Sequence, residues 1–215
     1  MRKTLLLGCL VTLAVSSQAQ IINEGFEGID TLPENSYKAY TGGQAYGNWK
    51  VVGTPSVTGI DLVRDVWPGS ALGSDYWTDL AGTPGPGGIT RDLNLKKGTY
   101  TLAFLAFTNN GAYQIDFGIQ GVESRTISNS LVGADNLPVN ANWTLFTEEY
   151  EILSDGTYAL SFVTPQGGNG NVGIDDILFD TAGGPGGQQA VPEPFTLALG
   201  AAGLVSALRR RRHRN

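Results

Sequence analysis

The sequence predicts an all-β protein whose central region folds as a β-sandwich. Between residues 21 and 180, short runs rich in Val, Ile, Thr, Tyr and Phe alternate apolar with polar positions. Many of the 30 glycines and 10 prolines of the chain separate these runs as turn residues. No segment of this region has the 3.6-residue periodicity of an amphipathic helix, so strands and turns are the expected elements.

Ten strands are expected. They lie near residues 21–27, 48–52, 57–63, 75–80, 88–95, 99–107, 112–120, 144–152, 157–164 and 172–179. Turn-rich loops are expected at 65–73 and 81–88, a hairpin turn at 109–111, and the longest irregular stretch at 121–142.

Two of the expected strands share the pattern G-T-Y-x-L-x-F, at residues 98–104 and 156–162. Because side chains alternate along a strand, the Tyr, Leu and Phe of each pattern project to the same face. The segments around the two patterns do not match each other. We therefore expect equivalent strands in two facing sheets, and not a tandem repeat.

The N-terminus has the three parts of a cleavable signal peptide. Arg2 and Lys3 are basic, residues 5–15 are apolar, and residues 17–19 are small enough for signal peptidase, so we expect cleavage after Ala19. A lipoprotein signal at Cys9 is the alternative, but it would leave only residues 5–8 as the apolar region, which is too short for export.

Residues 181–190 are rich in Gly and form a predicted flexible linker, which follows a sandwich domain expected at residues 20–180. After the linker come Pro192, Glu193 and Pro194, the apolar run 195–208, and the four consecutive arginines Arg209, Arg210, Arg211 and Arg212. As a helix the apolar run would be about 21 Å long, which is short against roughly 30 Å of bilayer hydrocarbon. The arginines would hold its end in the cytoplasm and leave the domain outside.

This ordered set at residues 191–215 resembles the PEP-CTERM sorting signal of Gram-negative, exopolysaccharide-producing bacteria. The resemblance implies that the helix anchors the chain transiently in the inner membrane and that exosortase cuts near Pro-Glu-Pro. The protein would then pass to the cell surface or the extracellular matrix. A plain C-terminal membrane anchor is the alternative.

Composition narrows the possible functions of the expected mature chain, residues 20–194. It keeps seven of the 14 Lys and Arg residues and all 20 Asp and Glu residues, so its formal charge is −13. That charge argues against nucleic acid as a partner. The segment also has no His and no Cys, which excludes Ser-His-Asp and Cys-His nucleophiles and His- or Cys-ligated zinc. We expect a protein that is not an enzyme.

Four short motifs resemble those of galactose-binding-like domains, a superfamily that includes many carbohydrate-binding modules. They are residues 23–27, residues 78–82 with 87–93, the two G-T-Y strands, and the closing strand Ile174-Asp175-Asp176-Ile177. The resemblance implies a jelly-roll sandwich and carbohydrate binding. It departs from the family pattern at Glu24 and Gly25.

Calcium is the cofactor that this resemblance implies. In many such modules an opening glutamate and a closing aspartate hold a structural Ca²⁺, which takes six to eight oxygen ligands. Here the corresponding residues are Glu27 and Asp176, with Asp175 and Glu24 as alternates. Strict alternation along the closing strand also turns one of the two aspartates toward an apolar layer, where an ionised group needs a partner.

Sugar recognition would need exposed aromatic rings with polar side chains beside them. Trp49 and Trp143 lie in strand contexts and are expected to pack in the core. Trp67 lies in a loop, and Tyr76 and Trp77 must face opposite ways on one strand, so one of the two should face solvent. The candidate ligand-binding residues are Trp67, Tyr76, Trp77, Tyr113 and Arg91.

Together these features predict an exported, surface-sorted, non-catalytic protein of an exopolysaccharide or biofilm matrix that binds extracellular polysaccharide. Signal peptidase and exosortase would act on it during export. A structural or adhesive matrix protein without a small ligand is the first alternative. A glycoside hydrolase that uses two carboxylates is the second.

Overall fold

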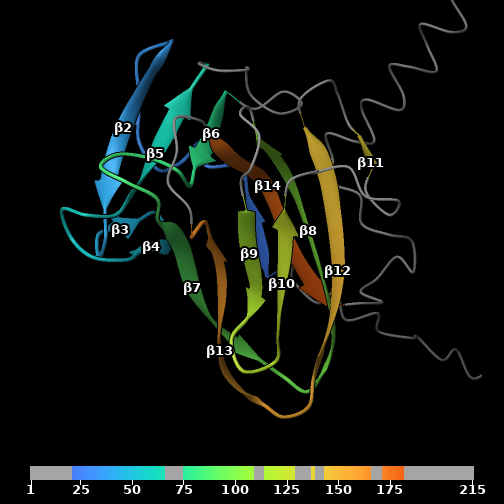
Figure 1. Ribbon diagram of the computed structural model, residues 1–215. Coiled ribbons are helices and arrows are strands. Elements are labelled where there is room, and N and C mark those ends of the chain that lie inside the picture. The colour runs from blue at the N-terminus through green and yellow to red at the C-terminus, as the bar shows by residue number, and fades with distance from the viewer. Residues whose placement is uncertain are drawn as a thin grey trace, which may run out of the picture.

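Two antiparallel sheets pack face to face in the part of the chain that the structure, a computed structural model, describes (Figure 1). That part comprises residues 21–65, 75–108, 114–128, 137–138, 143–165 and 171–181. It contains 14 strands and no helix, so it has no helix that could cross a membrane. The all-β prediction is confirmed. The predicted signal peptide and sorting signal lie outside the described residues.

The larger sheet has eight strands. In spatial order they are β11 (Leu137–Pro138), β12 (Thr144–Ile152), β8 (Gly98–Thr108), β14 (Val172–Thr181), β6 (Tyr76–Asp79), β5 (Gly59–Arg64) and β2 (Ser36–Thr41), with β1 (Ile22–Glu24) beside β14. Strand β14 pairs with β8 along one edge, and with β6 and then β1 along the other. The opening and closing strands of the chain are therefore neighbours.

The smaller sheet has six strands, in the order β10 (Glu123–Ser128), β9 (Gln114–Ile119), β13 (Gly156–Val163), β7 (Gly88–Leu95), β4 (Trp49–Val52) and β3 (Ala45–Tyr46). From β7 onward the chain crosses repeatedly between the two sheets, as in a jelly roll.

All ten expected strands are present, and four further strands were not expected. Strands β3 and β11 have two residues each, β2 has no buried residue, and residues 123–126 of β10 are exposed, so none of the four carries a clear apolar signal. The prediction of an irregular stretch at 121–142 is wrong where β10 and β11 form, because these strands pair with β9 and β12.

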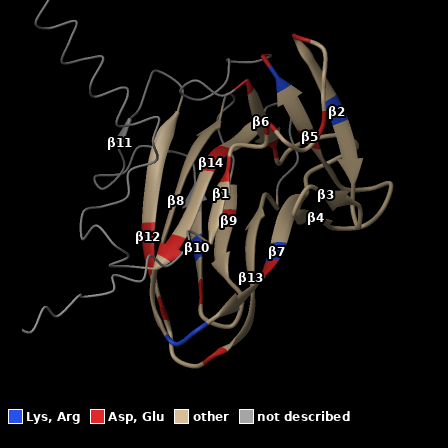
Figure 2. Ribbon diagram, turned by 180° about the vertical axis from the view of Figure 1, so that it is seen from behind, with Lys and Arg blue, Asp and Glu red and all other residues tan. Residues whose placement is uncertain are grey.

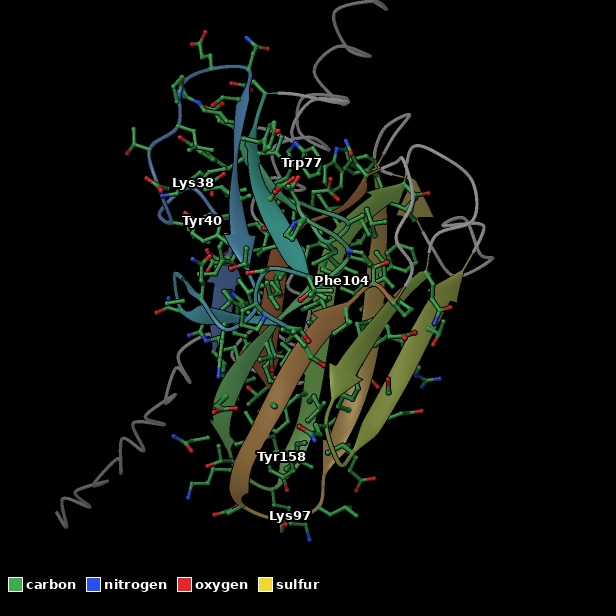
Figure 3. All side chains as sticks on the ribbon, turned by 60° about the vertical axis from the view of Figure 1, so that its left-hand side comes forward. Lys38, Tyr40, Trp77, Lys97, Phe104 and Tyr158 are labelled. Carbon is green, nitrogen blue, oxygen red and sulfur yellow. The ribbon has the colours of Figure 1, made fainter. Side chains whose placement is uncertain are left out.

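An aromatic layer fills the space between the sheets. Phe104 on β8 lies 5.0 Å from Phe162 on β13, 4.8 Å from Phe117 on β9 and 5.4 Å from Phe146 on β12, measured between ring centroids. Figure 3 places Phe104 inside the sandwich, where it is fully buried. The two G-T-Y strands therefore face each other from opposite sheets, as the sequence pattern predicts.

The larger sheet is apolar on its outward face as well. Trp77, Phe107 and Trp143 meet there edge to face, with centroids 4.6 to 6.2 Å apart. Phe107 lies over Gly173, where a Cβ atom would come within 1.9 Å of the ring. Trp143 and Trp49 are both buried, which confirms that they pack in the core.

Strand β14 does not alternate strictly, contrary to the prediction. A bulge between Asp175 and Leu178 shifts its register against β8, and Asp176 adopts a left-handed backbone with φ of 47°. The extra residue keeps Ile174 and Ile177 on the same inward face although they are three residues apart. The side chains of Asp175 and Asp176 therefore do not point in the directions that strict alternation predicts.

Replacing Phe104 with Ala should destabilise the domain by about 3 to 5 kcal/mol, because it removes the ring that joins three strands of two sheets. Val57→Ala is the matched control, since Val57 is 62% exposed and its truncation should cost under about 0.5 kcal/mol. Urea unfolding of both variants measures the difference. Equal losses would contradict the proposed packing.

Candidate functional site

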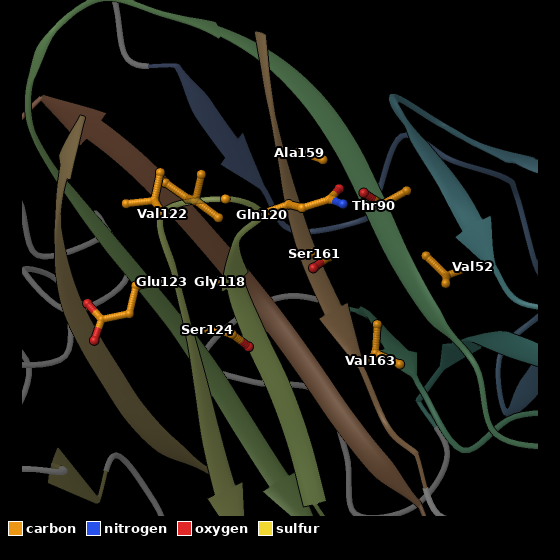
Figure 4. A pocket seen from close by; sticks show the side chains of 12 residues that line it. Val52, Thr90, Gly118, Gln120, Val122, Glu123, Ser124, Ala159, Ser161 and Val163 are labelled. Carbon is orange, nitrogen blue, oxygen red and sulfur yellow. The ribbon is translucent and has the colours of Figure 1, made fainter. Parts of the chain in front are cut away.

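A groove of about 580 Å³ runs over the outward face of the smaller sheet (Figure 4). Strand β13 lies beneath it, with β7 and β4 on one side and the hairpin of β9 and β10 on the other. The lining residues are mostly small or polar: Val52, Thr90, Gly118, Ile119, Gln120, Gly121, Val122, Glu123, Ser124, Ala159, Ser161 and Val163.

Strand alternation places these side chains. On β13, Leu160 and Phe162 point into the core, so Ala159 and Ser161 point outward into the groove. At the tip of β9, the Gln120 backbone N–H donates to the Ala159 carbonyl at 2.9 Å and so holds the hairpin against β13. The positions that point into the core therefore determine which side chains of β13 line the groove.

Gly118 permits the close approach of β9 and β10 beside the groove. Its φ is +148°, and a Cβ atom there would lie 2.3 Å from the Glu123 carbonyl oxygen. Such a backbone conformation favours glycine.

The groove is close to neutral. The one carboxylate among its described lining residues, Glu123, lies 3.2 Å from the Arg125 guanidinium, which also reaches Glu148 of β12 at 3.6 Å and so links the two sheets. Figure 2 shows that the Lys and Arg residues of the described part are spread over the domain. The groove therefore offers no cationic surface to an acidic ligand.

Hydroxyl and amide groups give the groove its chemistry. Ser124 and Ser161 provide hydroxyls, Gln120 provides an amide, and Val52 and Val163 provide C–H surface. The Thr90 hydroxyl donates to the Leu160 carbonyl at 3.2 Å and retains its acceptor lone pairs. Such a lining suits a neutral polyhydroxyl ligand, which has hydroxyls at its edges and C–H groups on its faces.

Of the predicted ligand-binding residues, the three that the structure describes, Tyr76, Trp77 and Arg91, do not line the groove. The expectation that one ring of Tyr76 and Trp77 faces solvent is wrong: Tyr76 is buried between the sheets and Trp77 in the outward apolar cluster. Side chains on both faces of β6 are buried, and the alternation of residues along one strand cannot predict this. Trp67 and Tyr113 lie outside the described residues.

Arg91 is half-buried on β7 and packs over the face of Trp49, 6.0 Å from the ring centroid. The Trp49 indole N–H in turn donates to Glu24 Oε2 at 3.4 Å. Arg91 shares the strand face of the core residues Ile89 and Leu93, so it points away from the groove.

The structure brings Glu27 and Asp176 together beside β1. Burial, followed by the negative charge of Glu27, raises the pKa of the Asp176 carboxyl to about 6. Asp176 Oδ2 is buried and has no hydrogen-bond partner among the described residues. A carboxylate oxygen that is buried beside a like charge fits a cation-binding role.

The two alternates have other contacts. Glu24 Oε1 accepts the Phe26 N–H at 3.2 Å, and Asp175, which is fully buried, accepts the Asp176 N–H at 2.8 Å. Within the described residues, no group of three or more His, Cys, Asp or Glu side chains is placed to hold a metal ion. A cation beside Glu27 and Asp176 would therefore take its remaining ligands from backbone carbonyls or water.

No protein-family model matches the chain, and no curated protein sequence matches it significantly. Several solved structures are similar. The chain is 15% identical to TmCBM61, described in complex with β-1,4-galactotriose, over 76% of this chain and 99% of that one, with a TM-score of 0.42. It is 18% identical to the C-terminal family 22 carbohydrate-binding module of Clostridium thermocellum Xyn10B, over 77% and 96%, with a TM-score of 0.41.

Larger proteins are matched over part of their length. The similarity to the Cry4Aa toxin of Bacillus thuringiensis covers 57% of this chain and 21% of the toxin, at 16% identity and a TM-score of 0.40. The chain thus spans about a fifth of that protein and nearly all of the isolated modules.

Sequence analysis missed the groove residues because nothing in the pattern distinguishes them from ordinary solvent-facing positions. Thr90, Gln120 and Ser161 are 30 to 71 positions apart in the chain and meet only because β7, β13 and β9 are neighbours in the sheet. The alternation of polar and apolar residues predicts which side chains of each strand face solvent, but it does not predict which strands are neighbours in the sheet.

Gly118→Ala should destabilise the domain by more than about 1 kcal/mol, because the added Cβ would collide with the backbone of β10 in a conformation that favours glycine. Gly28→Ala is the matched control, since a Cβ there has nothing within 4 Å. Thermal unfolding compares the two variants. A Gly118→Ala protein as stable as Gly28→Ala would contradict this geometry.

Proposed function

We propose that this domain is a non-catalytic carbohydrate-binding module and that a neutral polysaccharide binds in the groove over β13. The observation that carries the proposal is the groove itself, a hollow of about 580 Å³ lined by small hydroxyl, amide and aliphatic groups. This volume lies within the range of roughly 300 to 1,000 Å³ that is usual for ligand sites.

The polarity of the groove supports an uncharged ligand. Within the part of the chain that the structure describes, the lining has a single carboxylate, which is paired with Arg125, and no Lys or Arg. Sugar hydroxyls can both donate to and accept from Gln120 and Ser161, and the sugar C–H faces can pack on Val52 and Val163. The ligand would lie across β13, between β7 and the hairpin of β9 and β10.

A structural or adhesive matrix protein is the second candidate. One observation favours it: no aromatic ring is among the described residues that line the groove, and stacking on aromatic rings is a common basis of sugar binding. In that case the polar face would meet other matrix components without a discrete site.

Glycoside hydrolysis has little support. The reaction ordinarily needs two carboxyl groups that flank the bond to be cut. Among the described residues that line the groove, Glu123 is the one carboxylate, and the buried cross-strand carboxyls Asp61 and Asp79 belong to the other sheet.

We further propose that the chain is exported and sorted to the surface of a Gram-negative bacterium. The proposal rests on the sequence of residues 1–19 and 191–215, with signal peptidase and exosortase as processing partners. The Gly-rich residues after β14 would then act as a spacer between the domain and the membrane or matrix.

We also propose that Glu27 and Asp176 hold a structural Ca²⁺. Two observations of the described residues support it, namely the buried Asp176 oxygen without a partner and the like charge of Glu27 beside it. The ion would supply the positive charge that this pair lacks, and it would tie the chain after β1 to the bulge of β14.

Ser161→Trp should abolish polysaccharide binding, because a large ring on β13 would fill the groove. Thr157→Trp is the matched control: Thr157 is exposed on the same face of the same strand but is not among the lining residues. Affinity electrophoresis and calorimetry against a panel of neutral and acidic polysaccharides measure the effect. Binding that survives Ser161→Trp, or an absence of any binding by the folded protein, would move the assignment to the structural candidate.

Removing calcium with EDTA should lower the melting temperature, and adding Ca²⁺ should restore it, because only the folded state brings Glu27 and Asp176 together. Asp176→Asn should remove this response. The exposed Asp92→Asn should retain it. A melting temperature that is the same in EDTA and in Ca²⁺ would contradict the calcium proposal.

A further inference from the structure

Two buried aspartates face each other across the hairpin of β5 and β6. Asp61 and Asp79 are direct cross-strand partners, and they are 8% and 4% exposed. Both point to the outward face of the larger sheet, since Leu62 and Thr78 between them point to the other side. Like charges directly opposite each other destabilise a sheet, and burial strengthens their repulsion.

The two carboxyls bind the backbone of the connection between β6 and β7, residues 80–87. Asp61 accepts the N–H and the hydroxyl of Thr83 at 3.1 and 3.3 Å, and Asp79 accepts the N–H of Ala81 at 2.9 Å. Asp79 also accepts the Val172 N–H of β14 at 2.8 Å. The pair therefore holds the start of the connection in place.

The connection is also fastened to β5 and to the smaller sheet. The Gly59 N–H donates to the Gly85 carbonyl at 2.7 Å, and the Gly87 carbonyl accepts the Thr164 N–H at 2.9 Å. Gly82 packs so closely on β5 that a Cβ atom would lie 2.4 Å from the Asp61 nitrogen. Loss of the hydrogen bonds at Asp61 and Asp79 would therefore weaken the attachment of the connection as far as Gly88, where β7 begins.

No cation offsets the pair. Residues 80–87 contain no charged side chain, and among the described residues neither aspartate forms an ion pair. The neighbouring β14 contributes Asp175 on the same outward face, and β2 places Ala39 opposite Asp61. Arg64, three residues along β5, is engaged with the Leu32 carbonyl and with Asp65 and Asp75. A proton is therefore the simplest means of relieving the repulsion.

We propose that Asp61 and Asp79 form a proton-dependent latch that fastens the 80–87 connection to the larger sheet in mildly acidic solution and loosens it as the proton is lost. In the protonated state one carboxyl is neutral, so the two side chains do not repel each other, while their oxygens still accept the N–H groups of Ala81 and Thr83. In the ionised state two negative charges oppose each other within the sheet.

The direction of the pH effect follows from the pKa of Asp79. Burial mainly, and to a lesser degree the charge of Asp61, raise it from 3.8 to about 6, and burial raises the pKa of Asp61 as well. The folded state therefore holds a proton that the unfolded chain releases near its ordinary pKa. The stabilisation is fully present below about pH 4 and is lost as the pH rises through about 6.

Hydrogen exchange of the Ala81 and Thr83 amides between pH 4.5 and 7.5, corrected for intrinsic exchange rates, tests the latch on the full chain. Their protection should fall as the pH rises. Two pKa units correspond to about a hundredfold, so a decrease of at least about tenfold is expected within this range. Asp79→Asn keeps an oxygen acceptor but cannot ionise, and it should reduce the pH dependence of the protection relative to the wild type.

Asp92→Asn, at an exposed position on β7, serves as the control and should keep the wild-type profile. If Asp79→Asn fails to fold, Asp61→Asn provides the second variant, because it removes the opposing charge and should reduce the pH dependence. Any contribution of Asp176 is common to all these proteins and cancels in the comparison. A pH-independent wild-type profile, or an unchanged profile in Asp79→Asn or, in its place, Asp61→Asn, would overturn the proposal.

Discussion

The contact of Phe104 with Phe162 joins the two sheets, and the rest of the domain depends on it. These rings come from the two G-T-Y strands and lie at the centre of an aromatic layer that also contains Phe117 and Phe146. Since each strand presents alternate residues to this layer, the inward positions determine which residues remain for the outward faces. The location of any binding surface is thus a consequence of the core.

The two outward faces differ in kind. The larger sheet carries Trp77, Phe107 and Trp143 on its outward face, and all three are buried. The smaller sheet carries Thr90, Ser124 and Ser161, which line a groove. Tyr76 and Trp77, two of the aromatic residues that sequence analysis favours for sugar stacking, are therefore used for packing, and among the described residues the groove lies on the polar face.

The strands could be predicted from the sequence, but the binding surface could not. Tyr100, Leu102 and Phe104 follow a period of two that specifies a half-buried strand, and the same pattern at 156–162 correctly places its partner in the opposite sheet. The prediction that Tyr76 or Trp77 faces solvent was wrong because burial on both sides of a strand depends on residues distant in the chain. The orientation of Asp176 was not predicted because a bulge changes the direction of a side chain and has no signature in the local composition.

Buried carboxyls recur where the larger sheet meets its connections. Asp79 accepts a hydrogen bond from the connection that leads to β7, and Asp176 of β14 lies near Glu27, which follows β1. In both cases burial raises the pKa of the carboxyl, and a second acidic side chain raises it further. The described residues that line the groove on the other sheet are nearly free of charge by comparison, so the buried carboxyls of the larger sheet lie apart from the proposed binding surface.

We propose that the outward face of the smaller sheet binds a neutral polysaccharide. An NMR titration of the ¹⁵N-labelled protein with fragments of such a polysaccharide would test this proposal through the amide chemical shifts. We expect saturable shifts that cluster at Thr90, Gln120 and Ser161 and leave the amides around Trp77 unchanged. Shifts that cluster on the larger sheet, or no shifts with any neutral fragment, would contradict it.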